Sequence, residues 1–500
     1  MTTFDETTTA RATFEVRNPG TGDLVGTYPV QTDEDAAAAV ARARTAFAWW
    51  SGLGYAQRAD RLARFAGVLA RRTNQLAAVV HDETGKPYSD GALEVGLALD
   101  HLKWAGRNAR KVLGRSRAGV GLLTFDQAAS VEYKPLGVVG VIGPWNYPVF
   151  TPLGSIVYAL AAGNAVVFKP SEFSPGVGRW LVDMFAEVVP EQPVLQLLTG
   201  DGGTGAALCR AGVDKIAFTG STDTAKRVMA VCAESLTPLV AECGGKDVLI
   251  VDEDADLDSA AAAAVWAGMA NAGQSCIGTE RVYVHQRVYD AFLEKLVAQA
   301  NSVHAGTDAA ARIGPITMPR QVEVIRRHLQ DAVARGGRAL TGGVSAISGQ
   351  VVQPTVLVDV PEDALAVTEE TFGPTLTVAK VADMDEAVER ANASRYGLSA
   401  AVYSVARGRE LADRLRTGMV GVNAVFNVPR IPSLPFGGVA DSGFGRIHGP
   451  DGLREFTFAH AVARQRFAPL LALTTFDRTP STDALVAKAL TLLHGRRRWQ

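Results

Sequence analysis

Hydrophobic and polar positions follow two different patterns along the chain. Residues 35–50, 57–83 and most of 88–113 are rich in alanine and arginine and repeat with helical periodicity, which predicts a helical N-terminal region. After residue 130, short apolar runs that end at glycine or proline alternate with helical segments. In this first block we expect strands at 138–142, 165–171, 194–200 and 215–221, and helices at 151–162, 176–189, 203–210 and 222–234.

A second alternating block follows, without an internal repeat or a long low-complexity linker. Its expected strands are 247–251, 281–285, 375–381, 400–404 and 418–423, and its expected helices are 256–271, 287–301, 319–335, 384–393 and 408–415. Strands and helices that alternate at this spacing are typical of parallel α/β sheets. We therefore predict an α/β protein of two parallel units packed face to face, with ligands at the carboxyl ends of strands.

Composition narrows the function classes. The 500 residues carry a formal net charge of −2, so no strong field favours nucleic acid or an anionic membrane, and no nucleic-acid partner is expected. The four cysteines have no CxxC spacing and do not combine with histidines at metal-ligand spacing, which disfavours disulfides and any metal site. The N-terminus is polar and acidic, and no apolar run reaches about 20 residues. We expect a cytoplasmic protein.

Three residues suggest covalent catalysis. Asn146 lies between two prolines in PWNYP, where its amide is a candidate oxyanion donor or only a turn residue. Glu242 ends an apolar strand, where it is a candidate general base or a helix cap. Cys276 in NAGQSCIG is a candidate nucleophile or one more buried thiol.

Two further strand ends suggest a nucleotide site. Lys169 and Glu172 follow a buried strand and could hold the two hydroxyls of a ribose, although a solvated ion pair is the commoner arrangement. Gly220 and Ser221 join a strand to a helix whose N-terminus suits phosphate, but the full GxGxxG pattern is absent.

Together these segments identify a resemblance. The chain resembles the aldehyde dehydrogenase superfamily from about Asn18 to Ala463, with class-3-like features. The matching stretches are PWNYP, GNAVVFKPSE, FTGST, ECGGKD, GQSC, EETFGP (369–374), SRYGLSA (394–400) and PFGGVADSGFGR (435–446). Glu242 and Cys276 lie 34 residues apart, as the base and nucleophile of that family do.

The resemblance implies two Rossmann-like α/β units and a small β arm for oligomerisation. The cofactor-binding domain would comprise 1–117 and 136–243, and the catalytic domain 244–446. Segments 118–135 and 447–467 would form the oligomerisation elements of a homodimer or homotetramer, leaving 468–500 as a C-terminal extension.

The resemblance also implies a reaction, the NAD-dependent oxidation of an aldehyde to its acid. Cys276 would attack the aldehyde, Asn146 would hold the resulting alkoxide, and Glu242 would activate water to hydrolyse the thioester. The implied cofactor residues are Trp145, Lys169, Glu172, Gly220, Ser221, Glu370 and Phe372. Glu172 favours NAD because a carboxylate repels a 2′-phosphate, with NADP left open.

The substrate follows less directly. The candidate lining residues are Tyr147, Phe150, Thr151, Gly154, Ser275, Ile277, Phe426, Val428 and Phe436. This mostly apolar set favours a medium or long aliphatic aldehyde, or an aromatic one. Arg430 leaves a semialdehyde open. A CoA-acylating enzyme is disfavoured by Glu242, and a catalytically silent scaffold by the retained site residues.

Two departures and the tail complete the picture. Ser155 stands where many members carry lysine, so a proton relay through that position must differ, and Ala225 stands where glycine is common. Residues 481–500 predict a short amphipathic helix with a basic, Trp-bearing end. Such a tail could make peripheral membrane contact or pack on its own oligomer.

Overall fold

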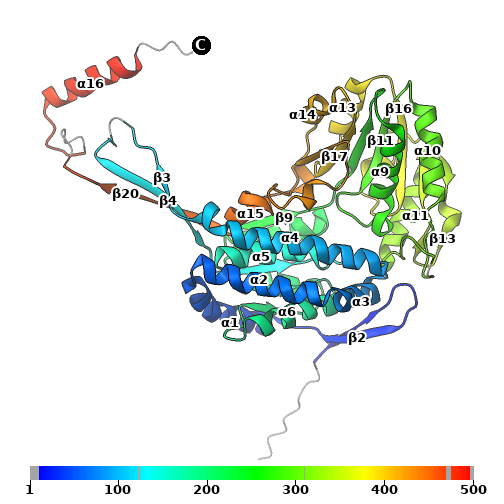
Figure 1. Ribbon diagram of the computed structural model, residues 1–500, viewed down its shortest axis with the longest axis horizontal. Helices are drawn as coiled ribbons and strands as arrows, with labels where there is room; N and C mark the ends of the chain where they lie inside the picture. Colours follow the sequence, from blue (N-terminus) through cyan, green and yellow to red (C-terminus); the bar gives the residue numbers. More distant parts are fainter. Residues whose placement is uncertain (1–10, 122–123, 309, 469–473, 496–500) are drawn as a thin grey trace, which may run out of the picture. The chain divides into compact units, whose positions relative to one another are not determined.

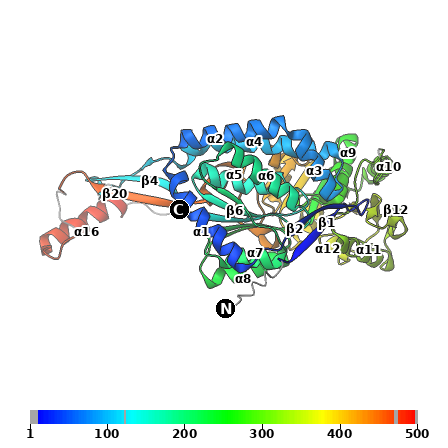
Figure 2. The same cartoon turned by 90° about the horizontal axis from the view of Figure 1, so that it is seen from below.

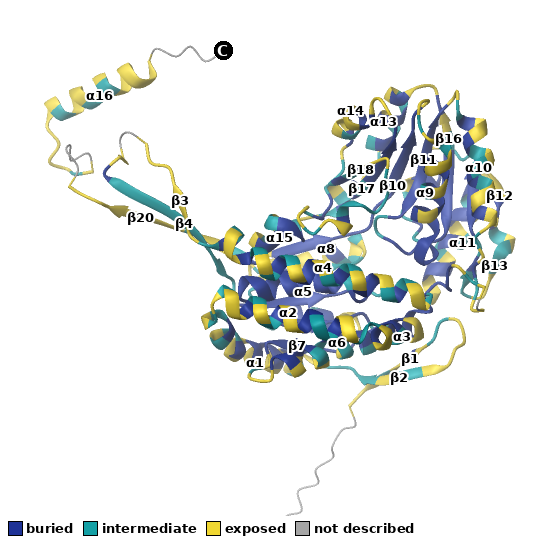
Figure 3. Ribbon diagram, in the orientation of Figure 1, coloured by how far each residue is buried: buried dark blue, intermediate teal, exposed yellow. Residues whose placement is uncertain are grey.

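The computed structural model describes residues 11–121, 124–308, 310–468 and 474–495. The chain divides into two compact units. The first comprises Met1–Leu113 and Lys134–Phe458, and the second comprises Gly114–Tyr133 and Ala459–Gln500. The first unit holds two large sheets, and most of their strands are buried, with the edge strands β12 (Arg338–Thr341) and β19 (Gly443–Phe444) as exceptions (Figure 3). The predicted α/β class is therefore confirmed, and the strands are long apolar runs because helices cover both faces.

The first sheet has six strands in the order β19-β9-β8-β5-β6-β7. Its members are β5 (Val138–Ile142), β6 (Ala165–Lys169), β7 (Leu195–Leu197), β8 (Lys215–Thr219), β9 (Leu239–Glu242) and β19 (Gly443–Phe444). All pair in parallel except β19, which pairs antiparallel to β9. The last strand thus returns from late in the chain to lie directly beside Glu242.

Helices enclose this sheet in layers. α5 and α6 lie on one side of the strands and α7 and α8 on the other, while α2 and α4 form an outer layer (Figures 1 and 2). Their bounds are α1 Asp33–Gly52, α2 Tyr55–Arg71, α3 Thr73–Thr84, α4 Tyr88–Leu113, α5 Phe150–Ala162, α6 Pro175–Val188, α7 Gly202–Arg210 and α8 Thr222–Glu234. The helical segment predicted over 57–83 consists of two helices, α2 and α3, which meet at Arg72, where φ is −110°.

The second sheet has seven strands in the order β12-β15-β16-β11-β10-β17-β18. They are β10 (Asp247–Val251), β11 (Thr279–His285), β12 (Arg338–Thr341), β15 (Thr355–Val358), β16 (Thr375–Val381), β17 (Ser399–Tyr403) and β18 (Met419–Val422). The sequence did not predict β12 and β15. All neighbours are parallel except the edge pair β12 and β15.

Alternate residues of β10 enter separate cores on the two faces of this sheet. Leu249 packs with the cluster of α9 (Leu257–Met269) and α10 (Tyr289–Asn301), and Ile250 with that of α13 (Met384–Asn392) and α14 (Gly408–Arg414). The remaining helices of this unit are α11 Pro319–Ala334, α12 Leu365–Thr368 and α15 Gly449–Glu455. Both faces of the sheet therefore carry a buried hydrophobic core.

Smaller elements complete the chain. Hairpins form from β1 (Thr13–Arg17) with β2 (Leu24–Pro29) and from β13 (Ile347–Ser348) with β14 (Val351–Val352). A three-stranded sheet, ordered β20-β4-β3, joins β3 (Ser116–Ala118), β4 (Gln127–Pro135) and β20 (Thr457–Gln465). The second unit also contains α16 (Pro480–His494). In the described part of the chain, no helix is long and apolar enough to cross a bilayer.

Candidate functional site

Cys276 lies in the loop that enters β11. Just before it, Asn271, Ala272 and Gly273 take φ values of 54°, 56° and 71° in succession. Left-handed backbone costs about 1–2 kcal/mol at each residue other than glycine, so surrounding contacts must hold this turn. Gln274 supplies one such contact, because its side-chain amide donates to the Asn271 carbonyl at 2.9 Å. The loop before the thiol is therefore held in one conformation.

The surroundings of Cys276 keep it a thiol at rest. Burial raises the pKa of the Cys276 thiol, and the carboxylates of Glu370, Asp247 and Glu242 raise it further. A thiolate is the reactive form of cysteine. Attack by Cys276 therefore requires a nearby group that takes its proton.

Glu242 is a buried carboxylate without a structural role for its side chain. It ends β9 and is 3% exposed. Neither carboxylate oxygen has a hydrogen-bond partner among the residues that the structure describes. Burial raises its pKa well above the usual range, with Arg446 opposing and Glu455 adding to the shift. A helix cap would accept hydrogen bonds, so the capping alternative does not describe Glu242.

The main chain of Glu242 has a separate partner. Its carbonyl oxygen accepts the N–H of Gly220 at 3.0 Å. Glu242 also pairs with Thr219 of β8 and with Gly443 of β19. The same residue therefore anchors the turn before α8 and projects a free carboxylate.

Asn146 is brought to the cysteine loop. Its side-chain Nδ2 donates to the carbonyl of Gln274 at 3.0 Å, across 128 residues of sequence. Its own carbonyl accepts from Asn271 Nδ2 at 3.0 Å. One hydrogen of the Asn146 amide is thus used, and the other has no acceptor in the described part of the chain.

Two residues that the sequence reasoning missed support Asn146. Lys86 donates to the Asn146 carbonyl at 2.8 Å and to Glu94 at 2.7 Å. Glu94 in turn accepts the N–H groups of Val149 and Phe150, at 2.7 and 2.9 Å, where α5 begins. Lys86 lies 60 residues from Asn146, and its motif, TGKP, gave no chemical signal by itself.

The predicted ribose residues lie at the end of β6. Lys169 Nζ lies 3.8 Å from Glu172 Oε2. Burial lowers the pKa of Lys169, which is 4% exposed, whereas Glu172 is half-exposed. The Lys169 side chain is therefore enclosed by its surroundings, whereas the Glu172 carboxylate faces partly into solvent. After β8, which lies two strands away across β5, Ser221 caps α8 by accepting the N–H of Thr224, which leaves the first N–H groups of the helix free for an anion.

The EETFGP segment, residues 369–374, contains two of the predicted cofactor residues, Glu370 and Phe372. Glu370 Oε1 accepts the N–H of Gly245 at 3.2 Å, and burial raises the pKa of Glu370 to about 8. Phe372 has φ 51°, and its ring lies edge-on to Trp145, with 5.5 Å between centroids. Phe372, two residues along the chain from Glu370, is therefore in contact with Trp145, and the roles of these residues in cofactor binding stay predictions.

A buried ion pair, also missed from the sequence, holds that segment. Glu280 accepts the N–H of Thr371 at 2.9 Å and that of Phe372 at 2.9 Å. Lys246 pairs with the same carboxylate and also donates to the Thr371 hydroxyl at 3.2 Å. The backbone of the segment is thus tied to β11, the strand that follows Cys276.

The predicted substrate residues divide into two groups. Phe150 and Phe436 lie 5.6 and 5.5 Å from the ring of His448, measured between centroids. Tyr147 forms a side-chain hydrogen bond with Ser275, next to Cys276. His448 was not predicted. It is buried, and neither of its ring nitrogens has a partner in the described ranges.

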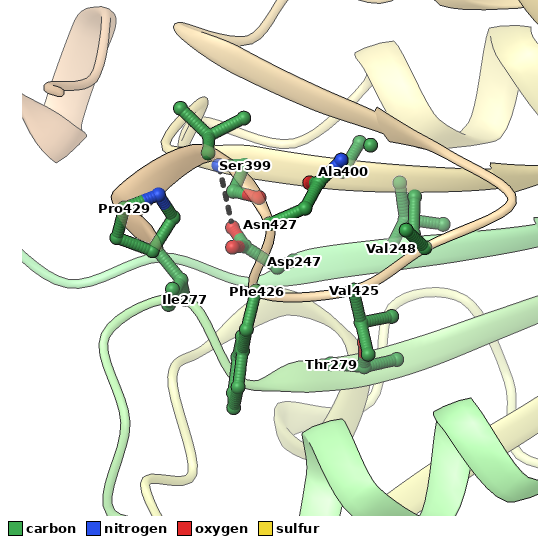
Figure 4. Close-up of a pocket in the computed structure, with 14 residues that line it drawn as sticks. Asp247, Val248, Ile277, Thr279, Ser399, Ala400, Val425, Phe426, Asn427 and Pro429 are labelled. Atoms are coloured by element: carbon green, nitrogen blue, oxygen red, sulfur yellow. Dashed lines mark hydrogen bonds between the residues drawn. The ribbon is translucent and has the colours of Figure 1, made fainter. Parts of the chain in front are cut away.

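Ile277 belongs to a neighbouring pocket at the starts of β10, β11 and β17 (Figure 4). Asp247 lies in this pocket and accepts the N–H of Ser399 at 3.1 Å. The lining residues are Asp247, Val248, Ile277, Thr279, Ser399, Ala400, Ala401, Gly421, Ala424, Val425, Phe426, Asn427, Val428 and Pro429. Two other candidates, Phe426 and Val428, are therefore neighbours of Ile277, whereas Arg430 is exposed.

Comparison with known proteins decides what this site belongs to. The sequence model of the aldehyde dehydrogenase family matches residues 6–462. The chain belongs to the aldehyde dehydrogenase family. A 4,4'-diapolycopene aldehyde oxidase from a Methylomonas species is 36% identical over 94% of this chain and 87% of its own. A glutarate-semialdehyde dehydrogenase from Pseudomonas aeruginosa is 33% identical over 89% of this chain and 92% of its own.

Solved structures of aldehyde dehydrogenases share the fold. An NAD-dependent aldehyde dehydrogenase from Sinorhizobium meliloti superposes with a TM-score of 0.88 at 31% identity, covering 93% of both chains. The predicted superfamily and enzyme class are confirmed: this aldehyde dehydrogenase is an oxidoreductase with a nicotinamide-dinucleotide-binding fold. Its family and its relatives establish oxidation of an aldehyde, and leave the choice of aldehyde to chemical argument.

Proposed function

We propose that this aldehyde dehydrogenase oxidises a medium or long apolar aldehyde to its carboxylic acid, with NAD as the favoured cofactor, through a thioester on Cys276. One observation carries the proposal. The Glu242 carboxylate is buried close enough to Cys276 to help raise the pKa of the thiol, and its two oxygens are unpartnered in the described structure. A buried carboxylate without partners is costly, and general-base chemistry explains why it is kept.

The proposed roles follow from what each residue can bind or transfer. The Cys276 sulfur bonds to the aldehyde carbon as its proton leaves to Glu242 or water, which gives a thiohemiacetal. The free N–H of Asn146 and the backbone N–H of Cys276 hold the new alkoxide. After oxidation leaves a thioester, Glu242 takes a proton from water as that water attacks, and the acid departs with the thiol restored.

The residues present fit a dinucleotide. A lysine and a carboxylate 3.8 Å apart suit the two hydroxyls of a ribose, as Lys169 and Glu172 offer. The N-terminus of α8 at Gly220 and Ser221 suits phosphate, and Glu370 suits the second ribose, between Phe372 and Trp145. When bound, NAD accepts the hydride that the thiohemiacetal releases. The half-exposed Glu172 favours NAD over NADP.

The substrate proposal rests on the side chains expected to line the aldehyde site. Phe150 and Phe436 are apolar, and Arg430, the residue that would favour a semialdehyde, is exposed. Tyr147 and Ser275 complete the proposed lining, whereas Ile277, also predicted for it, lines the neighbouring pocket. The relative named 4,4'-diapolycopene aldehyde oxidase agrees with an apolar substrate, and the one named glutarate-semialdehyde dehydrogenase makes the semialdehyde the competitor to test.

The experiment measures NADH formation at 340 nm for wild type and Cys276→Ala. The panel comprises straight-chain aldehydes of increasing length, benzaldehyde, succinate semialdehyde and 4,4'-diapolycopene aldehyde, each with and without CoA. We expect kcat/KM to climb with chain length and to vanish in the variant. Turnover of the semialdehyde alone would refute the apolar site, and a CoA requirement would refute hydrolysis by Glu242.

Assembly and localisation form a separate proposal. We propose a cytoplasmic homodimer or homotetramer that assembles through the β3–β4–β20 sheet, with α16 as a candidate for peripheral membrane contact. Leu485, Leu490, Leu492 and Leu493 of α16 are all exposed, which supports burial against either a membrane or another subunit. Light scattering and liposome sedimentation of full-length protein and a 1–480 truncation separate the two. Unchanged sedimentation removes the membrane contact.

A further inference from the structure

A buried ion pair supports the loop that carries Asn146. The side chains of Lys86 and Glu94 are each 1% exposed, and their charged atoms lie 2.7 Å apart. Lys86 belongs to the short link between α3 and α4, and Glu94 to the second turn of α4. Removing two charges from water is expensive, so such a pair persists when its remaining hydrogen bonds are well satisfied.

Among the described residues, the side-chain hydrogen bonds that the pair makes outside itself all go to one segment, residues 146–150. Lys86 Nζ donates to the Asn146 carbonyl and lies 4.2 Å from the centre of the Tyr147 ring. Glu94 Oε1 accepts the N–H groups of Val149 and Phe150. The pair therefore binds the backbone at both ends of the segment, at Asn146 through Lys86 and at Val149 and Phe150 through Glu94.

The support itself is rigid. Gly85 closes α3 with φ 71°, and a Cβ there would meet Pro315 at 2.5 Å, so only glycine fits. The carbonyl of Lys86 lies 2.7 Å from Nδ1 of His81. Lys86 is thus fixed through its backbone before its side chain reaches Asn146.

We propose that Lys86, held by Glu94, is a positioning residue that aims the Asn146 amide at the oxygen of the reacting aldehyde. The inference rests on the proposed role of Asn146 as oxyanion donor. The Asn146 side chain already spends one hydrogen on Gln274, so the direction of the second is set by the backbone that Lys86 holds. A donor displaced by about 1 Å loses most of its effect on the transition state.

A double-mutant cycle tests the proposal on the full-length enzyme. Asn146→Ala is expected to lower the burst rate of NADH formation about 10²–10³-fold. Lys86→Met is expected to lower the same rate about 10–100-fold, with the Kd for NAD changed less than threefold. Because Lys86 acts through Asn146, the double variant is expected to be within about threefold of Asn146→Ala alone.

Two further variants keep the test decisive. Glu94→Gln retains an oxygen for Val149 and Phe150 but removes the charge that holds Lys86, and it replaces Lys86→Met in the cycle if the latter does not fold. Arg58→Met is the matched control, since Arg58 is a buried cation that donates to the Ala161 carbonyl at 3.3 Å, at the far end of α5. Its effect should be small, and it should multiply with that of Asn146→Ala.

The outcomes separate this inference from the proposed function. If the effects of Lys86→Met and Asn146→Ala multiply, or if folded Lys86→Met keeps the wild-type burst rate, positioning by Lys86 is overturned. If wild type forms no NADH with any aldehyde, or Cys276→Ala retains full activity, the proposed function itself fails. Non-additivity confined to the Lys86 and Glu94 variants supports the inference.

Discussion

Gly244 offers the sharpest test of the predicted cofactor role of Glu370, because the structure sets the size of the perturbation. Gly244 follows Glu242 by two residues, and its φ is not in the left-handed region, so alanine is compatible with the backbone. A Cβ at Gly244 would lie 2.0 Å from Oε1 and 2.2 Å from Oε2 of Glu370. Ordinary contact begins near 3.4 Å, so the carboxylate must retreat by about 1.4 Å.

That retreat breaks the hydrogen bond from the Gly245 N–H to Glu370, which is worth about 1.5–3 kcal/mol above about pH 8, where Glu370 is ionised. Replacing glycine by alanine restores about 0.4–1 kcal/mol through the unfolded chain. We therefore expect Gly244→Ala to lower the free energy of unfolding by only about 1–2 kcal/mol. A displacement of this size costs about 100-fold in kcat/KM for NAD.

Initial rates at saturating aldehyde and varied NAD, together with urea unfolding, give both numbers. Gly202→Ala is the control, since a Cβ at Gly202 meets nothing within 4 Å. Shortening the acid in Gly244→Ala/Glu370→Asp relieves the clash and should recover part of the lost kcat/KM. Wild-type NAD kinetics in Gly244→Ala, or a double variant no better than the single, would refute the reasoning.

Four further predictions concern three acidic residues. Glu242→Gln should keep one burst of NADH but lose steady turnover about 10²–10⁴-fold, with acyl-Cys276 visible by intact mass; unchanged turnover would exclude it as the base. Because burial raises the pKa of Glu242, the wild-type deacylation rate should rise with pH through that raised pKa, and this limb should be absent from the variant. Burial raises the pKa of Glu83 to about 7, so its contribution to stability is complete below the unfolded pKa near 4.5 and is lost as pH rises through about 7. In Glu83→Gln, the free energy of unfolding should therefore change less with pH between these two values. An unchanged pH dependence would contradict this. Glu172→Gln should raise kcat/KM for NADP about tenfold, a modest gain because Glu172 is half-exposed, and no gain would show that it does not face the 2′ position.

Periodicity and motifs anticipated most of the fold. The parallel strands of both sheets, except β15, were predicted because they are continuous apolar runs ending at glycine, proline or a polar residue. β12 was missed because three of its four residues are exposed and it has no apolar run, whereas β15 is a buried apolar run that was overlooked. The break between α2 and α3 at Arg72 has neither glycine nor proline to mark it. An exposed edge strand and a break of this kind are decided by tertiary packing and not by local sequence.

The site divides in the same way. Cys276, Glu242 and Asn146 were predicted because each lies in a recognisable motif, and the structure shows how Gln274 connects the first to the last. Lys86 and Glu280 were missed, since their partners lie 60 and 91 residues away and neither has an unusual neighbour in sequence. The assignment of individual catalytic and cofactor roles stays a prediction until the variants are measured.

The two ends of Glu242 have a kinetic consequence. Its carbonyl holds the Gly220 N–H at the turn before α8, while its carboxylate lies among the groups that act on Cys276. A ligand whose phosphates displace that turn would therefore also displace the end of β9, which carries Glu242, the proposed base. By reciprocity, an acyl group that repositions the base alters the grip on the ligand. Release of the reduced dinucleotide and hydrolysis would then be timed by one residue, so that water is activated in step with the departure of the coenzyme.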